Sequence, residues 1–284
     1  MTTKWIEIKI DIPSENAEDV SVHLIDLGSN GVITQDKESD KTSLTACFPS
    51  EEALYKTAEI KNHLDNLGLK YDITSKDLKD TDWETNWKKF FKPEKVTDRI
   101  VVKPTWEDYE SKGSEIVIEI DPKMAFGTGT HQTTKGCLKL IEEAVSRGNI
   151  LSMLDVGTGS GILAIAAAKL GIPKTIAIDT DKEALKVANE NISLNKVENY
   201  VRTAAITIDR IAVRFNLAAA NITADEIVKL SSYLKDRIDK GDYLILSGIL
   251  TSQKEAIRDS FKDLALEKEL IDGEWVSLLY KKTD

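Results

Sequence analysis

Eight residues, Leu-Asp-Val-Gly-Thr-Gly-Ser-Gly at positions 154–161, constrain the fold of this chain more than any other stretch. An apolar run ends in Asp155, three glycines follow at alternate positions, and residues 162–170 then read as an apolar helix. Because glycine has no Cβ, the backbone can turn sharply here and a ligand can lie directly against it. The unpaired N–H groups at the start of the helix suit a carboxylate or a phosphate. The segment therefore predicts a strand, a ligand-binding turn and a helix in succession.

The spacing of the glycines separates two classes of ligand. The dinucleotide fingerprint is Gly-x-Gly-x-x-Gly. In this loop the third glycine, Gly161, comes one residue earlier, and an acid stands two residues before the first, Gly157. Asp-x-Gly-x-Gly-x-Gly at the end of a first strand resembles the S-adenosylmethionine loop of class I methyltransferases.

Composition indicates a globular protein and argues against several other classes. The 284 residues, 41% hydrophobic and 30% charged, suffice for more than one domain with a real core. No apolar run approaches the roughly 20 residues of a membrane span, and the first residues lead into strand-like sequence without a signal-peptide core. The two cysteines and three histidines are scattered, so neither a disulfide framework nor a metal site is predicted. We expect a cytoplasmic protein without membrane association.

The formal net charge of −10 favours a basic partner over nucleic acid. Proteins that bind nucleic acid through phosphates usually carry a basic face or a high isoelectric point. An acidic enzyme is better matched to a basic macromolecule, through electrostatic steering and complementarity. We therefore expect no direct nucleic-acid binding.

Residues 1–75 predict a small α+β domain. The predicted elements are, in order, a strand at 5–12, a helix from Ser14 to Gly28, strands at 31–34 and 43–48, a helix from Ser50 to Gly68 and a strand at 69–73. The second helix is expected to bury Leu54, Ala58 and Leu64. The order β-α-β-β-α-β is that of the ferredoxin-like split motif, which hosts many functions.

Residues 76–95 predict a linker helix, in which Trp83 and Trp87 lie four apart and share one face. Residues 96–284 then alternate strands and helices, as in a parallel sheet. Strands are predicted at 100–102, 116–120, 152–156, 175–178, 200–204, 217–220, 243–246, 265–270 and 275–280, and helices at 135–145, 162–170 and 182–194. The last two strands would form an antiparallel hairpin. The expected fold is α/β and Rossmann-like, with seven strands in the sheet, plus the ferredoxin-like domain.

Candidate ligand-binding residues fall at the carboxyl ends of the strands, where open parallel sheets bind ligands. Besides the loop at Gly157, Asp179 ends the second strand and can accept hydrogen bonds from both ribose hydroxyls of an adenosine. Asp181 is the better cap for the following helix. Asn221 follows the strand at 217–220 and offers a donor and an acceptor. Thr134, where a threonine-rich loop meets a helix, can offer its hydroxyl.

Several segments together carry a specific resemblance. They are Asp-Pro-x-Met-Ala-Phe-Gly-Thr-Gly-Thr-His-x-Thr-Thr at 121–134, the loop at 155–161, Ala-Asn-Ile at 220–222, Trp-Glu-x-x-Trp-Lys-Lys-x-Phe-Lys-Pro at 83–93, Ser-Gly-Ile at 247–249 and Gly-Glu-Trp at 273–275. In this combination, and over essentially the whole chain, the sequence resembles the PrmA family. Members of that family methylate the eleventh protein of the large ribosomal subunit.

The resemblance implies methyl transfer from S-adenosylmethionine to lysine side-chain and N-terminal amino groups of a basic ribosomal protein, free or on the ribosome. It implies that Thr134, Gly157, Asp179 and Asn221 contact the cofactor and that the N-terminal domain recognises the substrate. No catalytic residue is predicted. No general base is assigned, since no acid is placed to orient His131.

Three positions depart from the usual pattern of the family or of methyltransferases in general. Gln132 stands where proline is common, and Thr223 stands where an apolar residue is usual. Ala204 and Ala205 lie where many methyltransferases place an acid near the adenine. Two other functions stay open at this point: methylation of RNA bases, and a non-catalytic module that binds the cofactor. The first usually carries Asn-Pro-Pro-Tyr where this chain has Asn-Ile-Thr.

Overall fold

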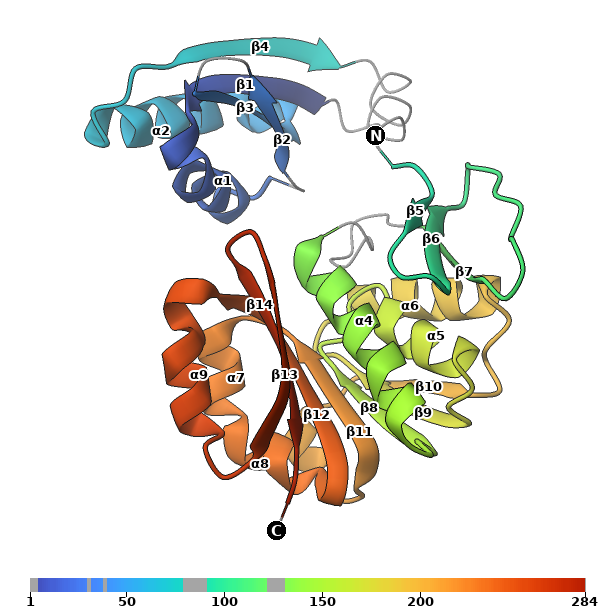
Figure 1. The fold of residues 1–284 in the computed structure, drawn as a ribbon. Helices are drawn as coiled ribbons and strands as arrows, with labels where there is room; N and C mark the ends of the chain where they lie inside the picture. Colours follow the sequence, from blue (N-terminus) through green and yellow to red (C-terminus); the bar gives the residue numbers. More distant parts are fainter. Residues whose placement is uncertain (1–4, 30–31, 38–39, 79–90, 122–130, 284) are drawn as a thin grey trace. The chain divides into compact units, whose positions relative to one another are not determined.

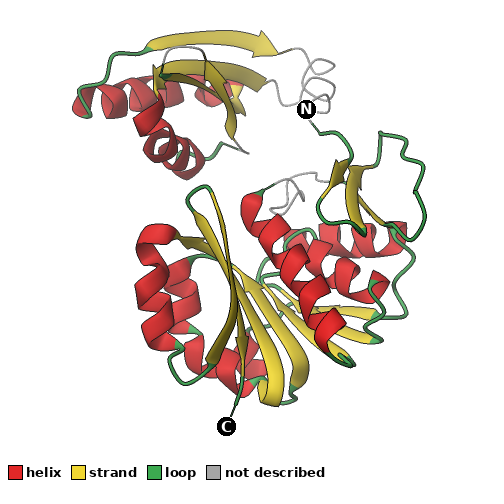
Figure 2. Cartoon of the chain, viewed as in Figure 1, coloured by secondary structure: helices red, strands yellow, loops and turns green. Residues whose placement is uncertain are grey.

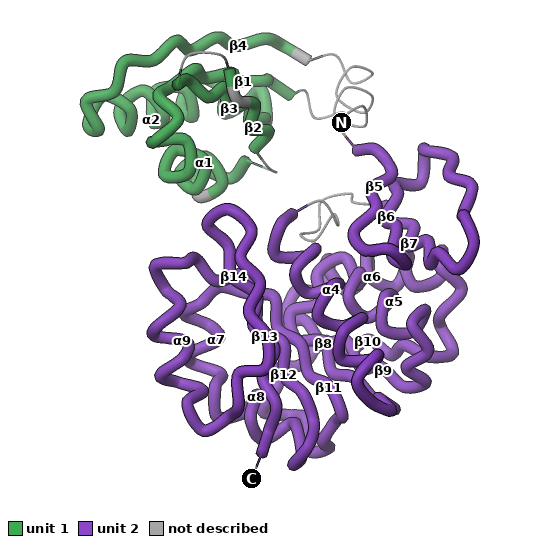
Figure 3. The backbone as a smooth tube through the Cα atoms, viewed as in Figure 1, with its two compact units in different colours: residues 1–90 green, residues 91–284 purple. Residues whose placement is uncertain are grey.

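The computed structural model describes residues 5–29, 32–37, 40–78, 91–121 and 131–283. The chain divides into two compact units, Met1–Phe90 and Phe91–Asp284 (Figure 3). Both ends of the segment predicted as a linker helix are extended: Lys76 lies in strand β4 (Asp72–Leu78) and Glu94 in strand β5 (Glu94–Lys95). The remainder, residues 79–90, lies outside the described residues. The division into domains at 1–75, 76–95 and 96–284 stays a prediction.

The first unit is a four-stranded antiparallel sheet with two helices on one face (Figure 1). Its elements are β1 (Trp5–Pro13), α1 (Ala17–Asp26), β2 (Val32–Lys37), β3 (Lys41–Pro49), α2 (Ala53–Asn66) and β4. The strand order is β2-β3-β1-β4. Alternate residues of β1, from Ile6 to Ile12, are buried against the helices. Both the order of elements and this alternation agree with the predicted split motif.

The buried face of α2 differs from the predicted one. Leu54 is 90% exposed and Ala58 is also exposed, whereas Ile60 and Leu64 are buried. Positions four apart share a helix face, so the face that contains Ile60 and Leu64 contacts the sheet and the face that contains Leu54 and Ala58 points away. Of the three residues predicted for the core, only Leu64 belongs to it.

Several elements begin at other residues than predicted, and for two of them the contacts give the reason. Strand β4 starts at Asp72 and not at Leu69, because the Leu69 N–H donates to the Leu64 carbonyl and so belongs to the C-terminal cap of α2. Helix α4 (Gln132–Arg147) starts three residues before the predicted position, because the His131 side chain accepts the Thr133 N–H and caps the helix there.

The second unit contains a seven-stranded sheet of order β10-β9-β8-β11-β12-β14-β13. Its strands are β8 (Ser152–Val156), β9 (Lys174–Ile178), β10 (Val201–Ala204), β11 (Phe215–Asn221), β12 (Ile238–Leu250), β13 (Ala265–Asp272) and β14 (Trp275–Lys281). Strands β8 to β12 pair in parallel, and β14 pairs antiparallel with both β12 and β13. The predicted C-terminal hairpin is therefore present, in a Rossmann-like α/β fold.

Helices cover both faces of this sheet (Figure 2). On one face lie α4, α5 (Ile162–Lys169) and α6 (Lys182–Leu194); on the other lie α7 (Ala224–Lys229), α8 (Ser231–Asp236) and α9 (Lys254–Ser260). Successive residues of a strand point to opposite faces, so Met153 joins the first core and Leu154 the second. Burial on both faces explains the near-continuous apolar character of the central strands, such as Leu-Ala-Ala-Ala at 217–220.

A small sheet of β5, β6 (Ile100–Pro104) and β7 (Ile116–Ile120) completes the unit, with β6 and β7 parallel. Its apolar residues, Ile118 and Ile120 among them, join the core beneath α4 and α5. Strand β7 also lies against α6, the helix that packs on the glycine loop. Among the described residues, no helix combines the length and the apolar character that crossing a membrane requires.

Candidate functional site

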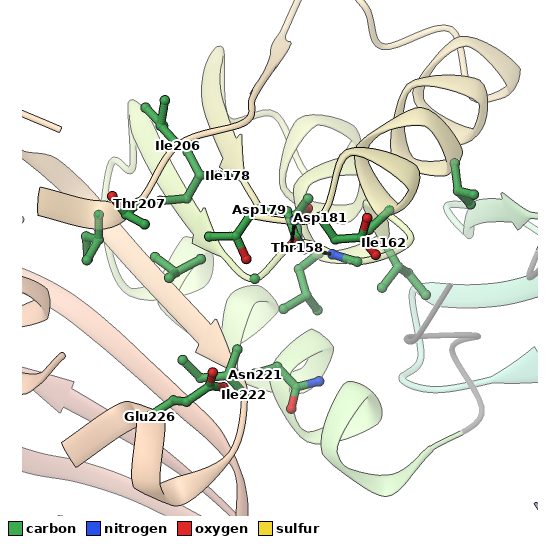
Figure 4. A pocket seen from close by; sticks show the side chains of 18 of the residues that line it. Thr158, Ile162, Ile178, Asp179, Asp181, Ile206, Thr207, Asn221, Ile222 and Glu226 are labelled. Carbon is green, nitrogen blue, oxygen red and sulfur yellow. Dashed lines mark hydrogen bonds between the residues drawn. The ribbon is translucent and has the colours of Figure 1, made fainter. Parts of the chain in front are cut away.

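The carboxyl ends of β8, β9 and β11 surround a cavity of 610 Å³. Thr134, Gly157, Asp179 and Asn221 all line it, although 87 residues separate the first from the last. Figure 4 shows Asn221 across the open space from Asp179. The parallel register brings the strand ends together at one edge, as the sequence predicts. The ligand-binding roles of these four residues remain predictions.

The glycine loop between β8 and α5 is held against the end of β9. The N–H groups of Gly157 and Thr158 both donate to the Ile178 carbonyl, at 2.9 and 3.0 Å. Gly157 has a φ of +71°, and a Cβ there would stand 2.5 Å from Cγ2 of Ile222. Two features of this position therefore favour glycine: the left-handed backbone and the close approach of Ile222, which follows β11.

Asp155 lies beneath this loop and is fully buried. Its Oδ2 accepts a 2.6 Å hydrogen bond from the Thr158 hydroxyl. Burial raises the pKa of Asp155 to about 7, and the nearby charge of Asp179 acts in the same direction, while the bond from Thr158 acts against it. Near neutral pH a small change in the surroundings of this carboxyl is therefore enough to add or remove its proton.

Asp179 connects the loop to helix α6. Its Oδ2 accepts the Gly159 N–H and its Oδ1 accepts the Asp181 N–H, both at 3.0 Å. Asp181 in turn caps α6 by accepting the Glu183 N–H, as predicted. The sequence interpretation left Asp179 free for a ligand, whereas its carboxylate already holds two backbone groups. An ionised carboxylate has about four acceptor sites, so room remains for two hydroxyl donors.

Two buried polar atoms in the cavity wall lack a partner among the described residues. Thr134 is 0% exposed, and its Oγ1 makes no hydrogen bond to any of them; the same holds for Oδ1 of Asn221. Leaving such an atom unsatisfied costs about 1–3 kcal/mol. Other described side chains, such as Ser43 and Thr175, also carry such an atom, but among the described residues with one only Thr134 and Asn221 line the cavity. The pair therefore fits the amino and carboxylate groups of an amino-acid moiety.

The cavity also has an apolar wall that the sequence interpretation missed. Ile178, Ile206, Ile208 and Leu230 line it, with Ile206 and Ile208 following the end of β10. Such a surface can contact the face of a flat aromatic base. It can do so without the acid that many methyltransferases have where this chain has Ala204 and Ala205. The available signal was the pair of isoleucines that closely follows a strand end, in a segment for which no element was predicted.

Charged side chains make the rim acidic. The described lining residues include five acids and one base: Asp179, Asp181, Glu183, Glu190, Glu226 and Lys186. Glu226 lies beside Asn221 in Figure 4 and accepts the Thr223 hydroxyl at 3.2 Å. A cleft of this charge concentrates cations such as a sulfonium or an ammonium.

His131 serves as a helix cap. Its Nδ1 lies 2.8 Å from the Thr133 hydroxyl and accepts the Thr133 N–H, while its ring contacts the Trp275 ring edge-on at 5.0 Å. Burial, together with the charge of Lys135, lowers the pKa of His131. The imidazole is thus neutral at pH 7 and its Nδ1 is engaged by the backbone. These contacts give no support for a general base at this position.

Comparison with known proteins identifies the family. The family model described as "Ribosomal protein L11 methyltransferase (PrmA)" matches residues 4–283. Proteins named ribosomal protein L11 methyltransferase from Pelobacter propionicus and Streptococcus mutans are 36% and 35% identical, over 99% of this chain and 99% and 97% of theirs. A crystal structure of ribosomal protein L11 methylase from Lactobacillus delbrueckii subsp. bulgaricus superposes with a TM-score of 0.63 and 29% identity, covering 68% of this chain and all of that one. The chain therefore belongs to the ribosomal protein L11 methyltransferase (PrmA) family, as its motifs predict, and its methyl donor is S-adenosylmethionine.

Proposed function

We propose that this chain methylates lysine side-chain and N-terminal amino groups of ribosomal protein L11, in the cytoplasm. The observation that carries the proposal is the cavity at the strand ends, in a chain of this family. It combines an apolar wall, two buried polar atoms without a described partner and an acidic rim. These features match, in turn, the base, the amino-acid moiety and the cationic centres of the donor and its amine substrate.

Four residues of the chain are proposed to hold the donor. Asp179 would accept hydrogen bonds from the ribose hydroxyls through its two remaining acceptor sites. The Thr134 hydroxyl and the Asn221 amide would bind the amino-acid moiety, since both carry a buried atom without a described partner. Gly157 would let the donor lie against the backbone, because a side chain there is excluded by Ile222.

The chain's contribution to the reaction is positioning and desolvation. When bound, S-adenosylmethionine supplies an electrophilic methyl group on a cationic sulfur. The cavity holds donor and amine in line, and alignment of this kind supplies much of the rate of a displacement. The attacking amine must be neutral, while a free lysine titrates near about 10.4. Desolvation in the cavity and repulsion by the sulfonium both lower that pKa. The rim acids, Glu226 among them, attract the charged amine to the entrance.

The N-terminal unit is proposed to recognise the ribosomal protein. All described residues that line the cavity belong to the second unit, so the first is available for another task. Its helices expose large apolar side chains, including Val22, Ile25, Leu54 and Tyr55. Exposed apolar groups of this size suit a protein partner more than a polyanion.

Labelled cofactor and ribosomes that lack the modification test the proposal. After incubation with the purified chain, we expect label in protein L11, in acid-stable methylated lysine and at the N-terminal residue. Fully methylated ribosomes serve as the control and should acquire no label. Label in ribosomal RNA would favour an RNA-base methyltransferase. Cofactor binding without any transfer would favour an interaction module, and either result would contradict the proposal.

Thr134→Val is expected to change stability and cofactor affinity in opposite directions. Valine has nearly the shape of threonine but removes a buried hydroxyl without a described partner, so the free protein should gain about 1 kcal/mol of unfolding free energy. The same change removes a donor to the cofactor and should raise its Kd about tenfold. Thermal unfolding and calorimetric titration measure the two effects. Unchanged affinity would remove Thr134 from the set of cofactor contacts.

A further inference from the structure

Asn191, in the last turn of α6, connects two backbone segments that are distant in sequence. Its Oδ1 accepts the Asp121 N–H at 2.9 Å, and its Nδ2 donates to the Ser160 carbonyl at 2.9 Å and to the Asp121 carbonyl at 3.4 Å. Ser160 belongs to the glycine loop, and Asp121 directly follows strand β7. Asn191 is 1% exposed, so its amide makes these bonds away from water. One side chain thus ties the glycine loop to the end of β7.

Asn195, one turn later, makes a similar set of hydrogen bonds, but none of them reaches the glycine loop. Its Oδ1 accepts the Glu119 N–H at 3.0 Å, and its Nδ2 donates to the Glu119 carbonyl at 2.6 Å. A third bond, at 2.8 Å, reaches the backbone carbonyl of Asn191. Both asparagines therefore pair with the backbone at the end of β7 as a neighbouring strand would. Only Asn191 also holds the glycine loop.

The glycine loop depends on such outside support. Gly159 and Gly161, on either side of Ser160, have φ values of +52° and +83°. Glycine reaches many backbone conformations, so bonds from neighbouring elements are needed to hold the loop in this one. Gly161 packs against Ala188 of α6, where a Cβ would stand 3.2 Å from the Ala188 backbone. Helix α6 thus supports the loop by packing at Ala188 and by a hydrogen bond at Asn191. Asp179 holds the adjacent Gly159 from the other side.

We propose that Asn191 is a positioning residue for cofactor binding, which fixes the glycine loop through the Ser160 carbonyl in the conformation that receives S-adenosylmethionine. The inference rests on the proposed role of this cavity. A group that contacts a ligand must be held to within a fraction of an ångström, so its supporting bonds affect affinity as well as stability. Loss of the Asn191 amide removes one buried donor from the Ser160 carbonyl and loosens the hold of α6 on the loop.

The test compares Asn191→Leu with Asn195→Leu in the full-length chain. Each variant loses an amide that makes three hydrogen bonds, so both should lower the midpoint of thermal unfolding by a similar amount. We expect Asn191→Leu to raise the Kd for S-adenosylhomocysteine and for S-adenosylmethionine about tenfold. Asn195→Leu should leave both within about twofold. At saturating cofactor, kcat should be unchanged in Asn195→Leu, since Asn195 neither lines the cavity nor holds the glycine loop.

Asn191→Asp keeps the test decisive if leucine prevents folding. Aspartate retains an oxygen for the Asp121 N–H and loses the donor to Ser160, so it should also weaken binding. Equal weakening by the Asn191 and Asn195 variants would overturn the inference, because the effect would then be general destabilisation. Wild-type affinity in a folded Asn191 variant would overturn it as well. If the wild-type chain itself failed to bind either probe, the proposed function would fall first.

Discussion

Asp179→Ala is expected to raise the Kd for S-adenosylmethionine by about two orders of magnitude, a loss of some 3 kcal/mol. The substitution removes the carboxylate proposed to accept hydrogen bonds from two ribose hydroxyls, and hydrogen bonds to a charged group contribute about 1.5–3 kcal/mol each. It also removes the acceptor of the Gly159 N–H, which holds the glycine loop at 3.0 Å. Titration calorimetry on the folded variant measures the loss.

Asp181→Ala is the matched control for Asp179. Asp181 also lines the cavity and also bears a carboxylate, but its Oδ1 caps α6 by accepting the Glu183 N–H at 2.8 Å. Its removal should cost about 1 kcal/mol of stability, as the loss of a helix cap does. Cofactor affinity should fall by less than about threefold. Equal losses of affinity in the two variants would mean that Asp179 acts only through the general acidity of the rim.

The sheet and the edge at which the cavity lies could be predicted because local patterns determine them. Strands buried on both faces are largely apolar, and those at residues 152–156 and 217–220 stand out for that reason. Parallel pairing then forces their carboxyl ends together, so Gly157 and Asn221 meet without any long-range information. The cap at Asp181 followed from its position before a periodic helix.

Residues whose role depends on a distant partner could not be predicted in this way. Asn191 lies in α6, a helix that was predicted, and Asn195 caps its C-terminal end, yet their bonds reach the end of β7, some 70 residues earlier in the chain. The signal was present: they occupy the same stripe of α6 as the buried Leu185 and Ala188, where an amide needs a partner. The prediction of the buried face of α2 was wrong for a similar reason: periodicity alone did not decide which of its apolar residues would contact the sheet.

Asp155→Asn is expected to remove a pH-dependent loss of stability from the cofactor-free protein. Below about pH 4 the carboxyl is protonated in both states. Between pH 4 and 7 the unfolded chain releases the proton while the folded protein, in which the pKa is raised to about 7, retains it. The folded state then binds more protons, so stability falls as pH rises, until Asp155 ionises in the folded state as well. From a reference pKa of 3.8, the total loss is about 4 kcal/mol.

Asparagine keeps an oxygen for the Thr158 hydroxyl and cannot ionise, so this component of the slope should vanish. The wild type and the variant should therefore diverge from about pH 4 upward and run parallel above pH 7, with the variant gaining relative to the wild type throughout that range. Urea unfolding at half-unit pH intervals measures the difference, and Asp225→Asn, at an exposed position, gives the baseline for removing one charge. Parallel curves from pH 4 to 8 would show that burial does not hold the Asp155 proton. A divergence that grows between pH 4 and 7 and then stays constant would mean that the free protein keeps this proton up to neutral pH.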